Sequence, residues 1–259
     1  MNVNRIFAIA NNTFREVVRD RILYIVPFYV IILVIGINLL PQIAAATEDK
    51  MFLDLGLAAI GFLGLIVAVF VAAGIINKEI EKRTILMLIA KPVSRGEFIV
   101  GKYFGLSAVI TLSIGAMSAI YLIFLQVNHI SYSSTSIIIN AFFLILQLSL
   151  ISAIAITFGV FTSSILAITL TFIVYLMGNI TQNLLILAHM SENSGLKRIT
   201  QGLYLLLPDL SRLDLKNEAV YGLSALPDAT TLFTNTAYSL FHITMFLALA
   251  VLIFSRKEF

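Results

Sequence analysis

Long apolar segments without charged residues dominate the chain and predict its architecture. No Asp, Glu, Lys or Arg occurs in residues 22–47, 55–77, 103–191 or 229–255. A helix needs about 20 apolar residues to cross a bilayer, so the third segment has room for three crossings, which we expect to be separated near residues 128–129 and 162–164. The pattern therefore predicts six transmembrane helices, at residues 23–46, 54–76, 98–126, 136–161, 164–189 and 232–254.

The stretch before the first predicted span has the periodicity of an amphipathic helix. Within residues 3–21, apolar side chains recur at helical spacing opposite asparagines and arginines. The stretch is too polar to cross a bilayer, and a charged amphipathic helix of this kind lies in the membrane interface. We therefore expect residues 1–22 to form an interfacial helix that leads into the first span.

Composition supports the same fold class. Hydrophobic residues make up 59% of the chain and charged residues only 12%, against about 25% charged in soluble domains. The expected fold is an all-α integral membrane protein with a single transmembrane domain over residues 1–259. The net charge of +3 does not indicate nucleic-acid binding, because the positive residues flank apolar spans. The absence of cysteine excludes disulfides, thiolate metal sites and a cysteine nucleophile.

The distribution of Lys and Arg predicts the orientation. With both termini in the cytoplasm, the inner side holds twelve of these residues and the outer side five, and cytoplasmic loops are the ones enriched in Lys and Arg. We expect a multi-pass protein of the inner (cytoplasmic) membrane. The segment 77–97 then faces the cytoplasm, and residues 190–231 form an outer loop that caps the bundle or re-enters it.

The segment 77–102 is an island of charge between the second and third predicted spans. Its apolar run, residues 85–90, is too short to cross a membrane and is followed by the helix-stopping Pro92. Ser94 and Glu97 then have the spacing of a capping box at the start of the third span. These features predict a rigid connector that contains a short helix. An ordinary loop whose charges only set the topology is the alternative.

Three short motifs in this island resemble a known family. They are Glu79-x-x-x-Arg83-Thr84, Lys91-Pro92-Val93-Ser94-Arg95 and Gly101-Lys102-Tyr103. The pattern is similar to the loop between the second and third helices in membrane subunits of type-2 ABC exporters. The six-helix layout, the amphipathic N-terminal helix and the basic C-terminal tail match as well. The compact six-helix form also resembles the permeases that serve maturation of a periplasmic copper enzyme.

The resemblance implies a coupling helix that docks on a separate ATP-binding subunit and transmits its closure to the membrane helices. It implies two ATPase subunits that bind ATP and Mg, a second permease protomer that is expected to be identical, and an optional periplasmic accessory protein. This chain itself is expected to bind no cofactor. The residues assigned to coupling by the resemblance are Glu79, Arg83, Thr84, Leu86, Ile89, Lys91, Pro92, Val93, Ser94, Arg95 and Lys102.

Other chemistry finds little support in the sequence. The phosphate-binding pattern G-x-x-x-x-G-K-[ST] is absent, so any ATPase of this system is expected to be another polypeptide. His129, His189 and His242 have no partner at metal-ligand spacing, and no paired carboxylates or nucleophile–base pair indicate a catalytic site. No charged residue is expected deep in a span, which argues against an ion-coupled carrier.

Uncharged polar side chains within the spans have two interpretations. They could line a substrate path, or they could form hydrogen bonds between helices, each worth about 0.6–2 kcal/mol in a membrane. The candidates for a path are Asn38, Gln147, Asn179, Gln182 and Asn183.

Small residues at Gly101 and Gly105, and at Ala155 and Gly159, permit close approach of another helix. That helix could belong to the same chain or to a second protomer. Taken together, the sequence predicts the permease subunit of an ATP-driven exporter that works by alternating access. A membrane scaffold that docks a cytoplasmic partner without a transport path is the alternative.

Overall fold

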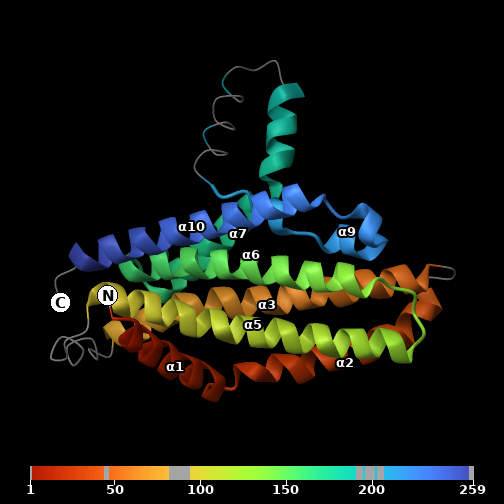
Figure 1. The fold of residues 1–259 in the computed structure, drawn as a ribbon, viewed down its shortest axis with the longest axis horizontal. Coiled ribbons are helices and arrows are strands. Elements are labelled where there is room, and N and C mark those ends of the chain that lie inside the picture. Colours follow the sequence, from red (N-terminus) through yellow and green to blue (C-terminus); the bar gives the residue numbers. More distant parts are fainter. Residues whose placement is uncertain are drawn as a thin grey trace.

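The computed structural model describes residues 2–43, 47–81, 94–190, 195, 202 and 207–256. Within these residues the chain is helical and contains no strand. The α-helices are α1 (Val3–Arg19), α2 (Ile25–Ile43), α3 (Glu48–Glu81), α5 (Arg95–Val127), α6 (Ser134–Phe161), α7 (Ser164–Met190), α9 (Lys216–Tyr221) and α10 (Ala229–Arg256) (Figure 1). The 3-10 helices are η1 (Ile22–Tyr24), η2 (Leu210–Leu213) and η3 (Leu223–Ala225).

Six of the described helices are long and apolar enough to cross a membrane, which confirms the predicted fold class and the number of spans. The largest difference from the predicted ends is at α3, which begins at residue 48 rather than 54 and continues to residue 81. Glu48 and Asp49 lie in its first turn, where the helix dipole favours negative charge. The acidic residues that bound the apolar stretch therefore belong to the helix itself.

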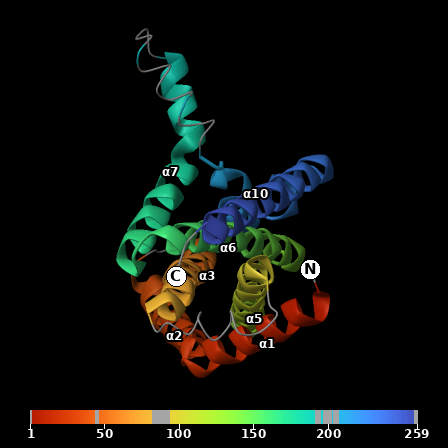
Figure 2. The same cartoon turned by 90° about the vertical axis from the view of Figure 1, so that its left-hand side faces the viewer.

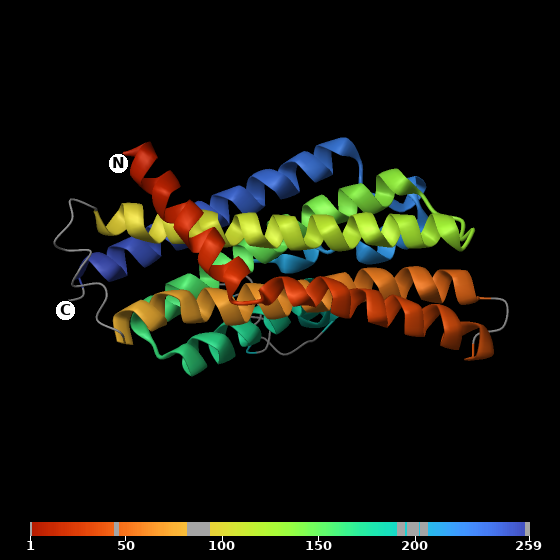
Figure 3. The ribbon, with the colours of Figure 1, turned by 90° about the horizontal axis from the view of Figure 1, so that it is seen from below.

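The helices α3 and α6 form the centre of the bundle, and they are the most buried of the six. The helix α5 packs against both, α10 packs along α6, and α1 crosses α5 obliquely (Figures 2 and 3). Both termini, the end of α3 and the start of α5 lie at the same end of the bundle (Figure 3). We call this the terminal end. The connector 82–93 joins α3 to α5 at this end and lies outside the described residues.

The second half of α7 leaves the bundle and projects away from the other helices (Figures 1 and 2). Residues 207–228, which follow in the described chain, return to the bundle with Leu210, Leu213 and Leu215 buried. The backbone N–H of Asp209 donates a 2.8 Å hydrogen bond to the Tyr238 hydroxyl of α10. This part of the predicted outer loop is thus fixed to the membrane-spanning helices.

Close contacts at three glycines show whether the helix that approaches them belongs to the same chain or to a second protomer. A Cβ at Gly101 would lie 2.7 Å from Ile9 Cβ, and one at Gly105 would lie 2.5 Å from the Ala10 carbonyl oxygen, both in α1. A Cβ at Gly159 would lie 3.1 Å from a carbonyl oxygen of α3. The helices that approach these glycines therefore belong to the same chain.

Candidate functional site

A group of charged side chains at the terminal end joins helices that are far apart in sequence. We call Glu16, Glu79, Arg95, Glu97 and Lys102 the brace cluster. Its centre is Lys102 of α5, whose side chain is only 3% exposed. The Lys102 ammonium forms ion pairs with Glu79 of α3 and, at 3.3 Å, with Glu16 of α1. One buried cation thus connects three helices.

Burial makes these ion pairs depend on each other. Removing an ammonium group from water costs several kcal/mol of free energy unless charged or hydrogen-bonding partners surround it. Two carboxylates and the face of Phe98, whose ring centroid lies 5.8 Å from Lys102 Nζ, provide that environment. Moving α1 or α3 away from α5 would leave Lys102 buried and short of a partner, so the cluster resists separation of these helices.

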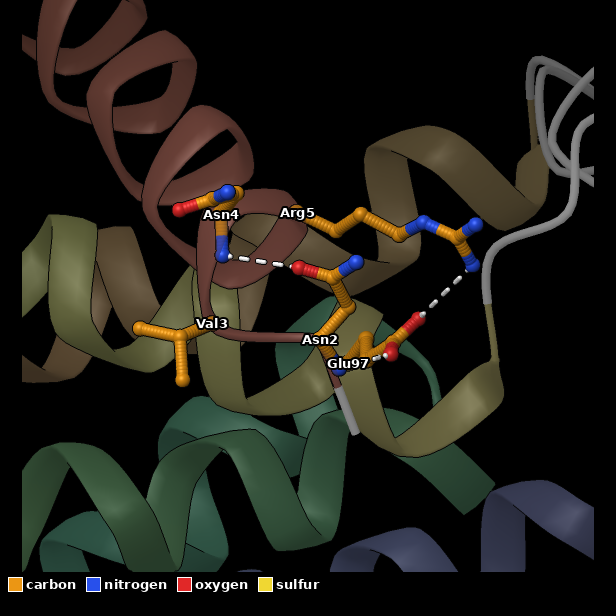
Figure 4. A pocket seen from close by; sticks show the side chains of 5 residues that line it. All are labelled: Asn2, Val3, Asn4, Arg5 and Glu97. Carbon is orange, nitrogen blue, oxygen red and sulfur yellow. Dashed lines mark hydrogen bonds and ion pairs between the residues drawn. The ribbon is translucent and has the colours of Figure 1, made fainter.

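Glu97 fixes the start of α5 and the start of α1 together. Ser94 Oγ accepts a hydrogen bond from the Glu97 backbone N–H at 3.2 Å, and the Ser94 N–H donates to Glu97 Oε2 at 2.9 Å, which confirms the predicted capping box. The other carboxylate oxygen accepts a 2.6 Å hydrogen bond from the Asn2 backbone N–H (Figure 4). Arg5 lies 4.0 Å from the same carboxylate (Figure 4). The first turn of α1 is therefore held by the first turn of α5.

Arg95 connects α5 to the end of α10. Its Nη1 donates to the carbonyl oxygens of Phe254 at 2.9 Å and Ser255 at 2.8 Å. The last carbonyls of a helix lack partners within the helix and carry partial negative charge, so a guanidinium there is favourable. Phe98 stacks on Phe254 with ring centroids 5.8 Å apart and reinforces the same contact.

The cluster can act as a mechanical junction. Residues 94–102 follow the connector 82–93 directly and bind α1, α3 and α10 through charged and hydrogen-bonded contacts. A displacement of the connector would therefore reach four helices together. Within the described residues, no group of His, Cys, Asp and Glu could hold a metal ion.

A family comparison now identifies the protein class. Residues 7–259 match the family model described as ABC-2 family transporter protein. The chain belongs to this family. A search of curated proteins gave no match. Members of this family are permease components of ABC transporters, and the ATPase is a different component. The brace cluster therefore belongs to the membrane subunit of an ABC transporter.

The predicted coupling residues of this permease fall into two groups. Glu79 and Lys102 bind each other, Ser94 caps α5, and Arg95 binds the end of α10. These four are thus placed in contacts within the chain. The others lie in the connector, outside the described residues: Arg83, Thr84, Leu86, Ile89, Lys91, Pro92 and Val93.

Two of the predicted path residues of the permease lie together and one lies apart. Gln147 of α6 donates to Asn179 of α7 at 3.4 Å and to the Leu210 carbonyl at 3.2 Å. Asn38 is exposed and donates to the Val34 carbonyl of its own helix at 2.6 Å. Two more predicted residues belong to α7, with side chains outside the described part of the structure: Gln182 and Asn183.

The contribution of α1 to the site was not predicted from the sequence. Glu16 and the Asn2 backbone both bind α5, although neither was expected to take part. The only signal in the sequence was the pair of small residues, Gly101 and Gly105, at the spacing of a close helix contact. Once α1 is known to occupy that surface, a carboxylate on α1 beside Lys102 becomes a natural expectation.

Proposed function

We propose that this permease is driven by a separate ATPase subunit that docks on segment 77–97, and that the brace cluster passes the movement of this segment to the membrane helices. Two permease protomers and two ATPase subunits would form the complex, with ATP and Mg bound by the ATPase. The resemblance to type-2 exporters supports export across the inner membrane, with both termini in the cytoplasm.

One observation carries this proposal. The residues directly after the connector, Arg95 to Lys102, bind three other helices through contacts that are buried or hydrogen-bonded. A flexible attachment would absorb a push from the ATPase, whereas this junction would move α1, α3, α5 and α10 in concert. A few kcal/mol of difference in ATPase affinity between two conformations shifts their populations substantially.

In alternating access, a substrate path would open first to one side of the membrane and then to the other. Gln147 and Asn179 form a hydrogen bond between α6 and α7, which is the other interpretation of these polar side chains, so a path near these two helices rests only on the presence of their polar groups within two spans. The second half of α7 projects from the bundle (Figure 2), and in this proposal α7 moves relative to the rest.

Co-purification from native membranes tests the proposed partner. A tagged permease should retain an ATPase subunit, and the double variant Arg83→Glu with Arg95→Glu should lose it or lose ATP-driven function while still inserting in the membrane. Arg83→Lys together with Arg95→Lys, which keeps both charges, is the matched control and should retain the partner. Recovery of the permease without any ATPase subunit would overturn the proposal. If the ATPase binds, but no compound stimulates its ATP hydrolysis or is moved across the membrane in reconstituted vesicles, the scaffold alternative is favoured.

A further inference from the structure

A cavity of about 250 Å³ lies between α3, α6 and α7, under the segment that carries η2 and α9. One wall is apolar and comes mainly from α3, with Leu57, Phe62 and Leu65. Asn140 and Gln147 of α6 and Tyr175 of α7 add polar groups to the lining, among apolar side chains of the same two helices. The cavity is separate from the brace cluster and shares no lining residue with it.

Two of the polar lining residues have hydrogen-bonding groups without a partner among the described residues. Asn140 is only 5% exposed, lines the cavity and makes no side-chain hydrogen bond to any residue that the structure describes. Gln147 is 4% exposed and uses its amide N–H groups, but its carbonyl oxygen accepts nothing from the described residues. The two residues are seven positions apart on α6, so they lie on the same face about two turns from each other.

Such groups need a partner inside a membrane protein. A buried amide without a hydrogen bond is costly where lipid replaces water, so polar groups of membrane-spanning helices are normally satisfied. Here the Asn140 amide and the Gln147 carbonyl oxygen belong to residues that line an open volume, which a bound molecule can enter. The geometry therefore favours an occupant that carries hydrogen-bonding groups along one edge.

The mouth of the cavity carries opposite charges. Asp214 and Lys216 line it and form a 2.9 Å ion pair, with side chains that are 28% and 44% exposed. The Tyr175 hydroxyl also lines the cavity and has no hydrogen-bond partner among the described residues. A partly exposed pair of this kind contributes little to stability, so it can exchange its internal contact for contacts with a ligand.

We propose that this cavity binds a small zwitterionic molecule with an apolar body, of the size of an aromatic amino acid. The body would lie on the α3 wall beside Phe62, the polar edge would face Asn140 and Gln147, and the charged ends would meet Lys216 and Asp214. The volume lies just below the range of roughly 300–1,000 Å³ typical of ligand pockets, which excludes a whole phospholipid. The inference concerns binding by this chain alone and does not depend on coupling to an ATPase.

Four compounds that share the phenylalanine side chain but differ in charge test the proposal on the purified full-length permease in lipid nanodiscs. They are phenylalanine, its amide, its N-acetyl derivative and the N-acetyl amide, which are zwitterionic, cationic, anionic and neutral. Radioligand or calorimetric binding should give the tightest binding for phenylalanine and at least tenfold weaker binding for the other three. Equal affinity for all four, or no binding of any, would overturn the proposal.

Variants locate the bound molecule. Asn140→Leu removes the unpaired amide and should weaken phenylalanine binding at least tenfold. Asn38→Leu is the matched control, since Asn38 is also an amide in a span but is exposed and bonds its own helix, and it should leave binding unchanged. If Asn140→Leu fails to fold, Lys216→Gln at the half-exposed mouth should lower affinity for phenylalanine but not for its amide. Unchanged binding in the variant that folds would contradict the site.

Discussion

Glu79 of α3 and Lys102 of α5 form an ion pair that joins the two helices on either side of the connector 82–93. The pair therefore holds the end of α3 and the start of α5 together. Because Glu16 binds the same ammonium, α1 is held with them.

Loss of the Lys102 charge should destabilise the permease. In Lys102→Met, Glu79 and Glu16 lose their shared cation. Breaking a fully buried pair costs 3–5 kcal/mol, but these carboxylates are 20% and 38% exposed, so we expect about 1–3 kcal/mol. Thermal unfolding of the purified protein measures the loss. Lys102→Arg keeps the charge and should lose less stability. Equal stability of Lys102→Met and the wild type would contradict the stabilising role of Lys102 in the brace cluster.

The close contact between α1 and α5 should not tolerate a methyl group at Gly105. Its Cβ would lie 2.5 Å from the Ala10 carbonyl oxygen, and a backbone atom cannot move aside cheaply. Overpacking costs about 1–3 kcal/mol, which exceeds the gain of about 1 kcal/mol from replacing glycine in a helix. Thermal unfolding should therefore show a net loss for Gly105→Ala.

Gly115 provides the matched control for that substitution. It lies in the same helix, and no atom is within 4 Å of the position that its Cβ would occupy. Gly115→Ala should be neutral or stabilising, because only the helix-propensity gain remains. A loss of stability at Gly115 equal to that at Gly105 would show that steric contact with α1 is not the cause.

Removal of the Arg95 guanidinium should loosen the end of α10. In Arg95→Leu the carbonyls of Phe254 and Ser255 lose a charged donor, worth about 1 kcal/mol at a helix C-terminus. Hydrogen exchange of the last turn of α10 should become several-fold faster, while exchange in the middle of α6 should not change. Protection equal to the wild type in this turn would rule out Arg95 as its cap.

Glu97 should hold the start of α1 through its acceptor oxygens. Glu97→Ala removes the acceptors for the Asn2 and Ser94 N–H groups and should make amide exchange at residues 2–6 several-fold faster. The expected cost is about 1 kcal/mol, as for loss of a helix cap. Glu97→Gln keeps one acceptor oxygen and should have an intermediate effect. If Glu97→Ala leaves exchange at residues 2–6 unchanged, Glu97 does not anchor α1.

Local patterns in the sequence predicted the elements well. The charge gaps predicted the six spans, the amphipathic period predicted α1, and the Ser94–Glu97 spacing predicted the start of α5. Each of these features depends on residues that are close together in the chain. Hydrophobic burial and helix capping act over such short distances, which is why the sequence displays them directly.

Contacts between distant segments were not predictable in the same way. Nothing in the periodicity indicates that Glu16 meets Lys102, since these residues are 86 positions apart and the pairing depends on how α1 crosses α5. The departure of α7 from the bundle was also unforeseen, because its sequence is long and apolar enough to cross a membrane like the other five spans. Likewise, Asn140 and Lys216 line the same cavity only because the 207–228 segment folds back onto the bundle.

A distance measurement tests the proposed coupling most directly. The chain contains no cysteine, so spin labels can be attached at Asn12→Cys in α1 and Thr135→Cys in α6, both of which are exposed. In the complex with its ATPase, ATP binding should change the distance between the labels, and Lys102→Met should abolish that change while Lys102→Arg keeps it. A change of equal size in the Lys102→Met complex would show that the movement does not pass through the brace cluster.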